Sequence, residues 1–400
     1  MAYSKVARTK KSFNDKIQSL NESTKESIGY LIANFENFTM EKYGTADLIP
    51  ELKKAEETEI YDVIQNWINW NSKLSTSTIQ VYFSHLRKYL HYFGIKLDDQ
   101  DIKSELTFKH KIQEERYGLK LSDIQSILKE MRYKNKVQYM CQLSSLMRIG
   151  EIIQLRKKHL ILGQDNIIVK IPPTIAKFSK ARTTFFSKES SKLLMPLLKD
   201  MKDNDLVFGS SNNSKFSAYK NKVNSQSATK QVLRLAVKKT GLTDTYESTG
   251  RYLINTHSFR AYGITKISRH DPNFAKMLSG QKGYLLQYDR MDDEEKLELY
   301  QKFESELYID NTEKLKKENQ EKDKTIIELE EKNQRIEKLE ERLDKIDLEE
   351  ATLRKLGISE KKLSKALKDK VHDDELYELL TETEKLRKEY NKVAYDIDFD

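Results

Sequence analysis

The chain has one cysteine, Cys141, among its 400 residues. A single thiol cannot form an intramolecular disulfide, and it leaves no cysteine cluster that could hold a structural zinc ion. We therefore expect a protein that works in a reducing, intracellular compartment, and a mechanism that depends little on bound metal. The localisation that follows from this is cytoplasmic.

Long apolar runs are also missing. No run approaches the ~20 residues that a membrane-spanning helix needs. The first residues, MAYSKVARTKKSFNDK, contain no apolar stretch of the kind found in a secretory signal. The chain is 34% charged and its mean hydropathy is −0.74, which predicts much exposed polar surface. We expect a soluble protein with no membrane partner.

Common enzyme signatures are absent as well. The sequence has no GxxxxGK[ST] phosphate loop, no HExxH zinc motif and no GxSxG nucleophile elbow. The segment GSSNNSK at 209–215 is rich in glycine and serine but lacks the spacing of a phosphate loop. This argues against an enzyme that depends on a phosphate loop, a zinc ion or a serine nucleophile, and we expect no cofactor.

The net charge of +8 is unevenly distributed. Residues 311–400 hold 21 basic and 26 acidic side chains, net −5, whereas residues 1–310 hold 50 basic and 37 acidic ones, net +13. A basic body favours a polyanionic partner such as DNA or RNA. Charge alone is weak support, because many proteins with no such partner are as basic.

Residues 21–105 are predicted to be helical. TKESIGYLIANFENFTMEKYG and STSTIQVYFSHLRKYLHYFGI have apolar residues at helical spacing, and both have a glycine at or near their end. The second segment carries His85, Arg87 and Lys88 among aromatic residues. They form either the solvent-exposed face of an amphipathic helix or a surface that contacts DNA, and the sequence leaves both interpretations open. Before this segment, residues 1–20 are expected to be a flexible basic terminus.

Residues 118–310 have a mixed pattern. KVQYMCQLSSLMRIGEIIQL is a mostly apolar, helix-like run, and NIIVKI and RTTFFS are predicted strands joined by a hairpin-like connection.

From 311 onward, Leu329, Ile336 and Leu343 recur every seven residues, which predicts a short coiled coil over 311–348. A single solvated helix is the alternative there. Short helices are expected over 349–400.

Four features of the mixed region can carry chemistry. Arg148 lies within an apolar run with Glu151 three residues later, where a charge is costly to bury unpaired. Lys177 and Lys180 lie at the tip of the expected hairpin. His257 and Arg260 form an HxxR pair, which suits a phosphate because arginine neutralises it and histidine transfers a proton. The segment SGQKGYLLQYDR supplies tyrosines downstream.

Taken in order, these motifs resemble the catalytic domain of the tyrosine recombinases, the phage-integrase family, over about 118–310. YDRMDDEEKLELY is similar to the archaeal-type integrases in particular. The resemblance implies the catalytic residues Arg148, Lys177, His257, Arg260, Gln281 and the nucleophile Tyr288, with Glu151 in support. Gln281 stands where the family usually has His or Trp. Lys180 rivals Lys177, His270 is a weak substitute for the missing histidine, and Tyr284 and Tyr300 are the alternative nucleophiles.

The resemblance also implies an organisation and a set of partners. We expect a mainly α fold with a small β-sheet, in which residues 21–105 form a core-binding domain of SAM-like type, 106–117 a linker and 118–310 the catalytic domain. The expected partner is a double-stranded DNA attachment site, occupied by a homo-tetramer, with further self-association through the coiled coil. His85, Arg87, Lys88, Lys180 and Arg182 are expected to contact DNA. When bound there, the protein would be associated with the nucleoid.

That function is a site-specific recombinase or integrase that cuts and rejoins DNA through a 3′-phosphotyrosyl intermediate, without ATP or metal. Two alternatives remain. One is a DNA-binding protein on a recombinase scaffold that no longer cuts. The other is a coiled-coil structural protein that its basic body anchors to nucleic acid.

Overall fold

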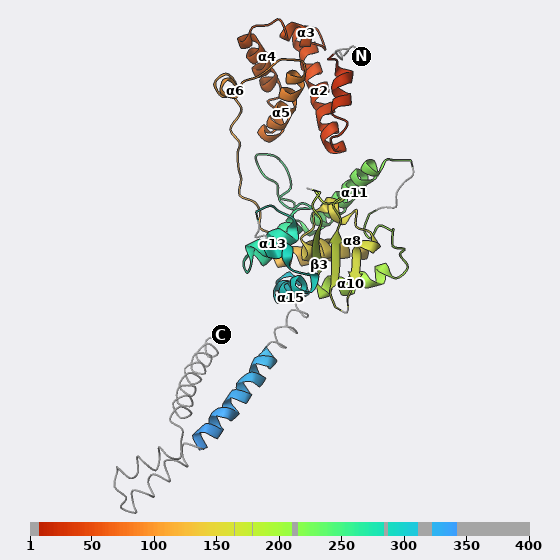
Figure 1. Ribbon diagram of the computed structural model, residues 1–400, viewed down its shortest axis with the longest axis vertical. Coiled ribbons are helices and arrows are strands. Elements are labelled where there is room, and N and C mark those ends of the chain that lie inside the picture. Colours follow the sequence, from red (N-terminus) through yellow and green to blue (C-terminus); the bar gives the residue numbers. More distant parts are fainter. Residues whose placement is uncertain are drawn as a thin grey trace, which may run out of the picture. The chain divides into compact units, whose positions relative to one another are not determined.

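The structure is a computed structural model that describes residues 8–163, 165–177, 179–209, 215–283, 287–310 and 322–341. Two compact units divide the chain, residues 1–307 and residues 308–400. The first unit contains many helices and one three-stranded antiparallel sheet (Figure 1). The predicted fold class, mainly α with a small sheet, is confirmed.

The N-terminal part of the first unit is helical. The helices over 22–43 and 76–92 begin and end close to where the sequence predicts, because local capping residues are present. Residues 10–16, within the segment expected to be a flexible terminus, form a helix that buries Phe13. Ser75 accepts a hydrogen bond from the amide of Thr78 at the start of one helix, and Gly44 ends another in the left-handed conformation that glycine adopts without strain. The six helices are α1 (Lys10–Lys16), α2 (Glu22–Tyr43), α3 (Ile49–Leu52), α4 (Glu57–Trp70), α5 (Thr76–Tyr92) and α6 (Asp99–Glu105).

These helices enclose a hydrophobic core of their own, drawn from residues 13–106. Leu31, Ile64 and Leu86 are fully buried in it, and so is Trp67, whose indole Nε1 donates a 2.8 Å hydrogen bond to Asn34. Burial of the aromatic ring with its polar atom satisfied stabilises this part of the unit. Residues 106–120, which follow α6, form neither helix nor strand.

The rest of the first unit combines helices with the sheet. A second core lies here, drawn from residues 137–208. The elements are α7 (Leu121–Lys129), α8 (Tyr133–Ser145), α9 (Ile149–Ile152), η1 (Lys157–His159), β1 (Leu160–Leu162), β2 (Ile167–Ile171), β3 (Arg182–Phe186), α10 (Lys188–Leu198), α11 (Ala218–Thr240), α12 (Ser258–Ser268), α13 (Pro272–Ser279), α14 (Gln287–Arg290), α15 (Asp293–Phe303) and η2 (Glu304–Leu307).

The sheet has the strand order β1-β2-β3, with each neighbouring pair antiparallel. In the β2–β3 ladder Val169 is opposite Thr184 and Ile171 is opposite Arg182. The two predicted strands are therefore confirmed, and the hairpin connection lies between them. Helices α8, α10, α13 and α15 all pack against β3, which explains why its middle and last residues are buried. The register also places Arg182 at the hairpin end of the strand.

The apolar run expected to be one helix is broken into two. Helix α8 ends at Ser145, and Leu146 adopts a left-handed conformation with φ +55°. That conformation costs of order 1–3 kcal/mol for a residue with a side chain, so packing around Leu146 must impose it. The break places Arg148 at the N-cap of α9 instead of inside a helix, with Glu151 in its first turn.

Helix α15 is attached to the sheet and to α8 along its length. Asp293 forms an ion pair with Lys170 and accepts a 3.0 Å hydrogen bond from Thr183. The hydroxyl of Tyr300 donates to the carbonyl of Ser144 at 2.9 Å, and its ring lies against Phe185. These contacts fix the segment that follows Tyr288.

In the second unit, residues 322–341 form a helix whose side chains are mostly exposed. Leu329, Ile336 and Leu339 are its three partly buried residues, and they lie at the positions expected for a coiled-coil seam. The described residues do not include the other parts of the predicted coiled coil, 311–321 and 342–348. They also do not include the predicted helices over 349–400. The coiled coil therefore stays a prediction. Within the described ranges, no helix is both long enough and apolar enough to cross a membrane.

Candidate functional site

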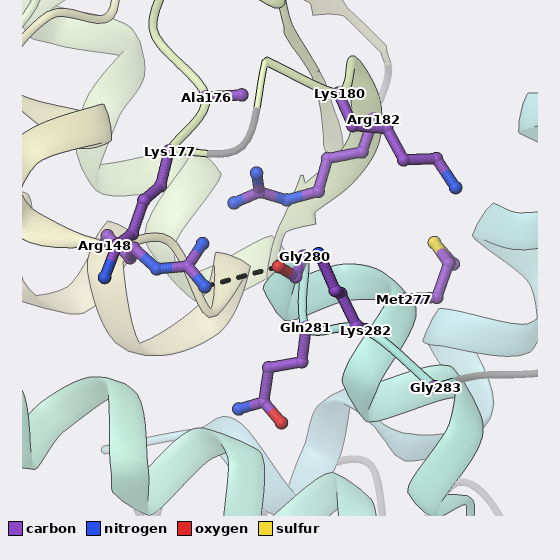
Figure 2. Close-up of a pocket in the computed structure, with 10 residues that line it drawn as sticks. All are labelled: Arg148, Ala176, Lys177, Lys180, Arg182, Met277, Gly280, Gln281, Lys282 and Gly283. Atoms are coloured by element: carbon purple, nitrogen blue, oxygen red, sulfur yellow. Dashed lines mark hydrogen bonds between the residues drawn. The ribbon is translucent and has the colours of Figure 1, made fainter. Parts of the chain in front are cut away.

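A pocket of about 290 Å³ lies between the hairpin, the start of α9 and the end of α13 (Figure 2). Its walls are strongly basic, which suits an anionic ligand. The lining residues are Arg148, Ala176, Lys177, Lys180, Arg182, Met277, Gly280, Gln281, Lys282 and Gly283.

Arg148 is held in this pocket by an acid and by a helix end. Its Nη1 lies 3.2 Å from Oε1 of Glu151, and its backbone amide donates to Oε2 of the same carboxylate at 2.9 Å. The guanidinium also donates to the carbonyl oxygens of Ser279 and Gly280, each at 3.3 Å. Those carbonyls end α13, where the helix dipole favours a cation. The side chain keeps 17% exposure, so its fork remains accessible from the pocket.

Arg260 meets Arg148 at the same carbonyl. It lies on α12, is 5% exposed and donates to Ser279 at 2.8 Å as well as to the carbonyl of Leu146. Helix α12 comes this close to α8 because Gly263 has no side chain, since a Cβ there would lie 2.5 Å from the carbonyl of Leu143. Two arginines that are 112 positions apart in sequence therefore converge on one oxygen.

Mutual repulsion among these cations makes the site receptive to an anion. Burial first, and then the charge of Arg148, lower the pKa of Arg260 to about 9, against the opposing influence of Glu151. The residue still carries its charge at neutral pH. Burial of Glu151 would raise its pKa, but the hydrogen bonds and charge of Arg182, followed by those of Arg148, outweigh this and hold the pKa below its usual value. An anion near the arginines would relieve the repulsion.

His257 is the N-cap residue of α12, one turn before Arg260. Burial lowers its pKa, and the neighbouring charges of Arg260, Arg148, Lys177 and Lys230 lower it further. The imidazole is therefore neutral at pH 7 and can accept a proton, as a general base must. His257 is near these charges but is not among the residues that line the pocket.

Both hairpin lysines line the pocket, but they leave the hairpin in different directions. In Figure 2, Lys177 extends toward Arg148, whereas Lys180 extends away from it. Gln281 is exposed at the pocket wall directly after Gly280. Lys282, which the sequence reasoning did not single out, lines the pocket too. The expected residues Arg148, Lys177 and Gln281 are thus brought together.

Tyr288 is not among the residues that line the pocket. It is 7% exposed, its ring lies against Phe274, and its hydroxyl donates a 2.5 Å hydrogen bond to Oδ2 of Asp271. Tyr300 is fully buried against α8 and β3, as a packing residue would be. Tyr284 lies outside the described residues.

Asp271 is the second residue that sequence reasoning missed. The segment SRHDPN is typical of a turn, and Asp271 does begin a helix there, because its Oδ1 accepts hydrogen bonds from the amides of Asn273 and Phe274. The Asp–Pro pair is a helix-start signal that the sequence offers. Its contact with Tyr288 has no such signal. His270 stacks on Phe303, so it does not substitute for a phosphate-binding histidine at the pocket.

The residues expected to contact DNA have different surroundings. Lys88 is exposed, while Arg87 forms a 2.6 Å ion pair with Asp99. His85 is half-buried, and its Nδ1 has no hydrogen-bond partner among the described residues. The pKa of His85 is lowered, first by burial and then by the charge of Lys88. Arg182 differs most from expectation. Its side chain is 8% exposed and lies 2.6 Å from Glu151, so it is a buried partner of that acid and does not extend to the surface.

The site offers cations and proton carriers instead of metal ligands. Across the described residues, no group of three or more His, Cys, Asp or Glu side chains could hold a metal ion. Arg148 and Lys177 line the pocket and can bind an anion there, whereas Arg260 is buried behind Arg148 and is not among the lining residues.

Comparison with known proteins finds one family model that matches this region. The model described as "Phage integrase family" matches residues 118–280. That range contains Arg148, Glu151, Lys177, His257 and Arg260, and it ends just before Gln281. A search of curated proteins finds no match.

Several solved structures are similar to this chain. A lambda integrase dimer bound to a COC′ core site is 13% identical, with a TM-score of 0.50 over 71% of this chain and 76% of that chain. XerH site-specific recombinase bound to difH substrate is 18% identical, with a TM-score of 0.45 over 72% and 81%. The Tn1549 transposon integrase in complex with transposon right end DNA is 14% identical, with a TM-score of 0.49 over 72% and 96%. At such identities the likeness to lambda integrase concerns the fold.

Proposed function

We propose that this chain, whose residues 118–280 make it a member of the phage integrase family, is a site-specific DNA recombinase that acts through a tyrosine nucleophile. The observation that carries the proposal is the convergence of Arg148 and Arg260 on one backbone oxygen beside Lys177 and His257. Two arginine forks that meet at one oxygen can also meet at the oxygens of one phosphate.

The proposed reaction is an in-line displacement at the scissile phosphate. Arg148 and Arg260 bind the non-bridging oxygens and stabilise the charge that builds up on them in the transition state. The phenolic oxygen of Tyr288 forms a bond to phosphorus, and the bond between phosphorus and the 5′ oxygen breaks. His257 accepts the phenolic proton, and Lys177 gives a proton to the departing 5′ oxygen. The product is a 3′-phosphotyrosyl ester.

The same groups serve the return reaction. The ester conserves the energy of the broken bond, so a 5′-hydroxyl of another strand can attack it and rejoin DNA without ATP. Gln281 can donate a hydrogen bond to a phosphate oxygen, but it does not titrate. We therefore assign it to phosphate binding alone.

Tyr288 has to leave Asp271 before it can attack, because its hydroxyl is engaged there and not at the pocket. The segment that carries it runs from the pocket residue Gly283 to Asp293, which is attached to the sheet. Lys177 is preferred to Lys180 for the proton transfer, because it extends toward Arg148.

On this proposal, residues 21–105 form a core-binding domain that contacts DNA, partly through Lys88, and the protein acts on paired attachment sites as a tetramer. The protein would work in the cytoplasm, on the nucleoid. The resemblance to archaeal-type integrases stays a prediction.

A suicide substrate tests the proposed function. The DNA is taken from the boundaries of the genetic element that encodes the protein, and a nick just downstream of the cleavage point lets the short fragment with the free 5′-hydroxyl escape. We expect a covalent protein–DNA band with the unmodified chain and none with Tyr288→Phe. A band that survives Tyr288→Phe and is lost with Tyr284→Phe or Tyr300→Phe would assign the nucleophile elsewhere. If no boundary DNA gives a band but the DNA is still bound, the chain is a non-cutting DNA-binding protein.

A further inference from the structure

Arg182 joins three separate segments of the first unit. Its guanidinium donates to both oxygens of Glu151, at 2.6 and 3.3 Å, and its Nε donates to the carbonyl of Leu278 at 3.0 Å. With 8% exposure, such a side chain is stable only when its charge is paired and its donors are satisfied. The contacts thus connect strand β3 to helix α9 and to the end of α13.

Glu151 transmits this constraint to Arg148. The carboxylate is 2% exposed, and it is shared between the two arginines. Arg182 forms the shorter of the two ion pairs, 2.6 Å against 3.2 Å for Arg148. Arg182 holds one side of the carboxylate in place. The carboxylate is therefore a fixed partner for the guanidinium of Arg148 on its other side. Arg148 is also the more exposed of the two, so it is the one left to meet a ligand.

Gly280 independently shows how closely the guanidinium of Arg182 packs against the end of α13. A Cβ at this position would lie 2.8 to 3.0 Å from three atoms of the Arg182 guanidinium, and the residue has φ +65°. Figure 2 shows Arg182 beside Gly280, with the dashed hydrogen bond of Arg148 reaching the same glycine. Both arginines therefore contact the point from which the chain continues toward Tyr288.

We propose that Arg182 is a positioning residue for DNA cleavage, which holds the Glu151–Arg148 pair and the end of α13 in the geometry that the scissile phosphate needs. The inference rests on the proposed function. Arg182 acts through Glu151 and the backbone of α13, and its burial distinguishes it from a residue that binds DNA at the surface. A cationic fork that is displaced by about 1 Å can lower a reaction rate on the order of 10²-fold.

Single-turnover cleavage of the nicked substrate tests this. With DNA at saturation, Arg182→Ala is expected to lower the cleavage rate constant on the order of 10²-fold, while DNA affinity changes little. Arg182→Lys keeps the charge but cannot bridge Glu151 and Leu278, so we expect it to restore little of the rate. Arg269→Ala removes an exposed arginine from the end of α12 and is the matched control, expected to cleave like the unmodified chain.

Full activity of Arg182→Lys would mean that charge alone matters, which would overturn the proposal. So would a loss of DNA affinity that accounts for the whole effect. The double variant with Glu151→Gln adds a third check: if Arg182 acts through Glu151, the two losses are not additive, whereas independent effects would multiply.

A measurement that needs no cleavage separates this inference from the proposed function. In protein labelled with ¹⁵N-arginine, the guanidinium signal of Arg148, assigned with Arg148→Lys, is expected to be sharp and slow to exchange. It should broaden in Arg182→Lys, and in Arg182→Ala if that variant folds. If the unmodified chain cleaves no DNA, the proposed function fails, and an unchanged Arg148 signal would separately rule out positioning by Arg182.

Discussion

The hydroxyl of Tyr288 donates a 2.5 Å hydrogen bond to Oδ2 of Asp271, and the other oxygen of that carboxylate caps helix α13. The proposed nucleophile is therefore held by an acid that belongs to the helix leading into the pocket. The hydrogen bond holds the phenol turned to Asp271. This arrangement has a direct consequence for the rate of attack.

Asp271→Asn is expected to release Tyr288 and to speed formation of the covalent intermediate. The amide oxygen of asparagine can still cap α13, but the uncharged side chain accepts a weaker hydrogen bond from the phenol. The measurement is the rate of covalent trapping on a nicked substrate. Asp271→Ala is the control for the cap itself and should cost about 1 kcal/mol of stability. Slower trapping by Asp271→Asn would show that Asp271 helps the attack.

Glu151→Gln should destabilise the protein most at neutral pH. The change leaves Arg148 and Arg182 without their buried carboxylate, and breaking a buried pair in this way costs about 3–5 kcal/mol. Because the folded-state pKa of Glu151 is lowered, its stabilising contribution is present above the usual value of 4.5 and is lost as pH falls through the folded-state value. Denaturant unfolding over a pH series should therefore give a shallower decline below pH 4.5 for the variant. Parallel curves would contradict this prediction.

His257 is expected to titrate below its usual pKa of 6.5, because burial and then the charge of Arg260 disfavour the imidazolium. The sign follows from linkage: a lowered folded-state pKa gives a contribution to stability that is complete above pH 6.5 and is lost as pH falls through the lowered value. An NMR titration of the imidazole signals, with His257→Asn for assignment, checks the direction. A pKa above 6.5 in the free protein would contradict this prediction.

The helix over 322–341 provides a prediction about self-association. Leu329 and Ile336 lie seven residues apart and are partly buried. If they form a coiled-coil seam, Leu329→Asp together with Ile336→Asp should abolish association of the free protein, because charges in the seam are costly to bury. Sedimentation equilibrium of the full chain gives the answer. Exposed Lys332→Asp is the control, and a chain that is monomeric before any substitution would show that 322–341 is a solvated helix.

Much of the local structure could be predicted from the sequence, because it depends on nearby residues. Caps such as Ser75, the glycine at 44 and the two strands of the hairpin follow from patterns within a few residues. The break at Leu146 could not be predicted, because no Gly or Pro marks it and tertiary packing imposes it. For the same reason the surroundings of Arg182 could not be predicted: its strand was expected, but the acid that buries it lies 31 positions away.

The sequence by itself determined which chemical groups the site contains, in what order along the chain, and hence which family the region resembles. Motif spacing is a local property, and it is independent of how helices pack. Only the tertiary structure decided that Arg148 and Arg260 share the carbonyl of Ser279, that Arg182 supports them through Glu151, and that Tyr288 is held by Asp271. These contacts depend on the left-handed turn at Leu146 and on the close approach of α12 to α8, which are set by the packing of residues far apart in sequence.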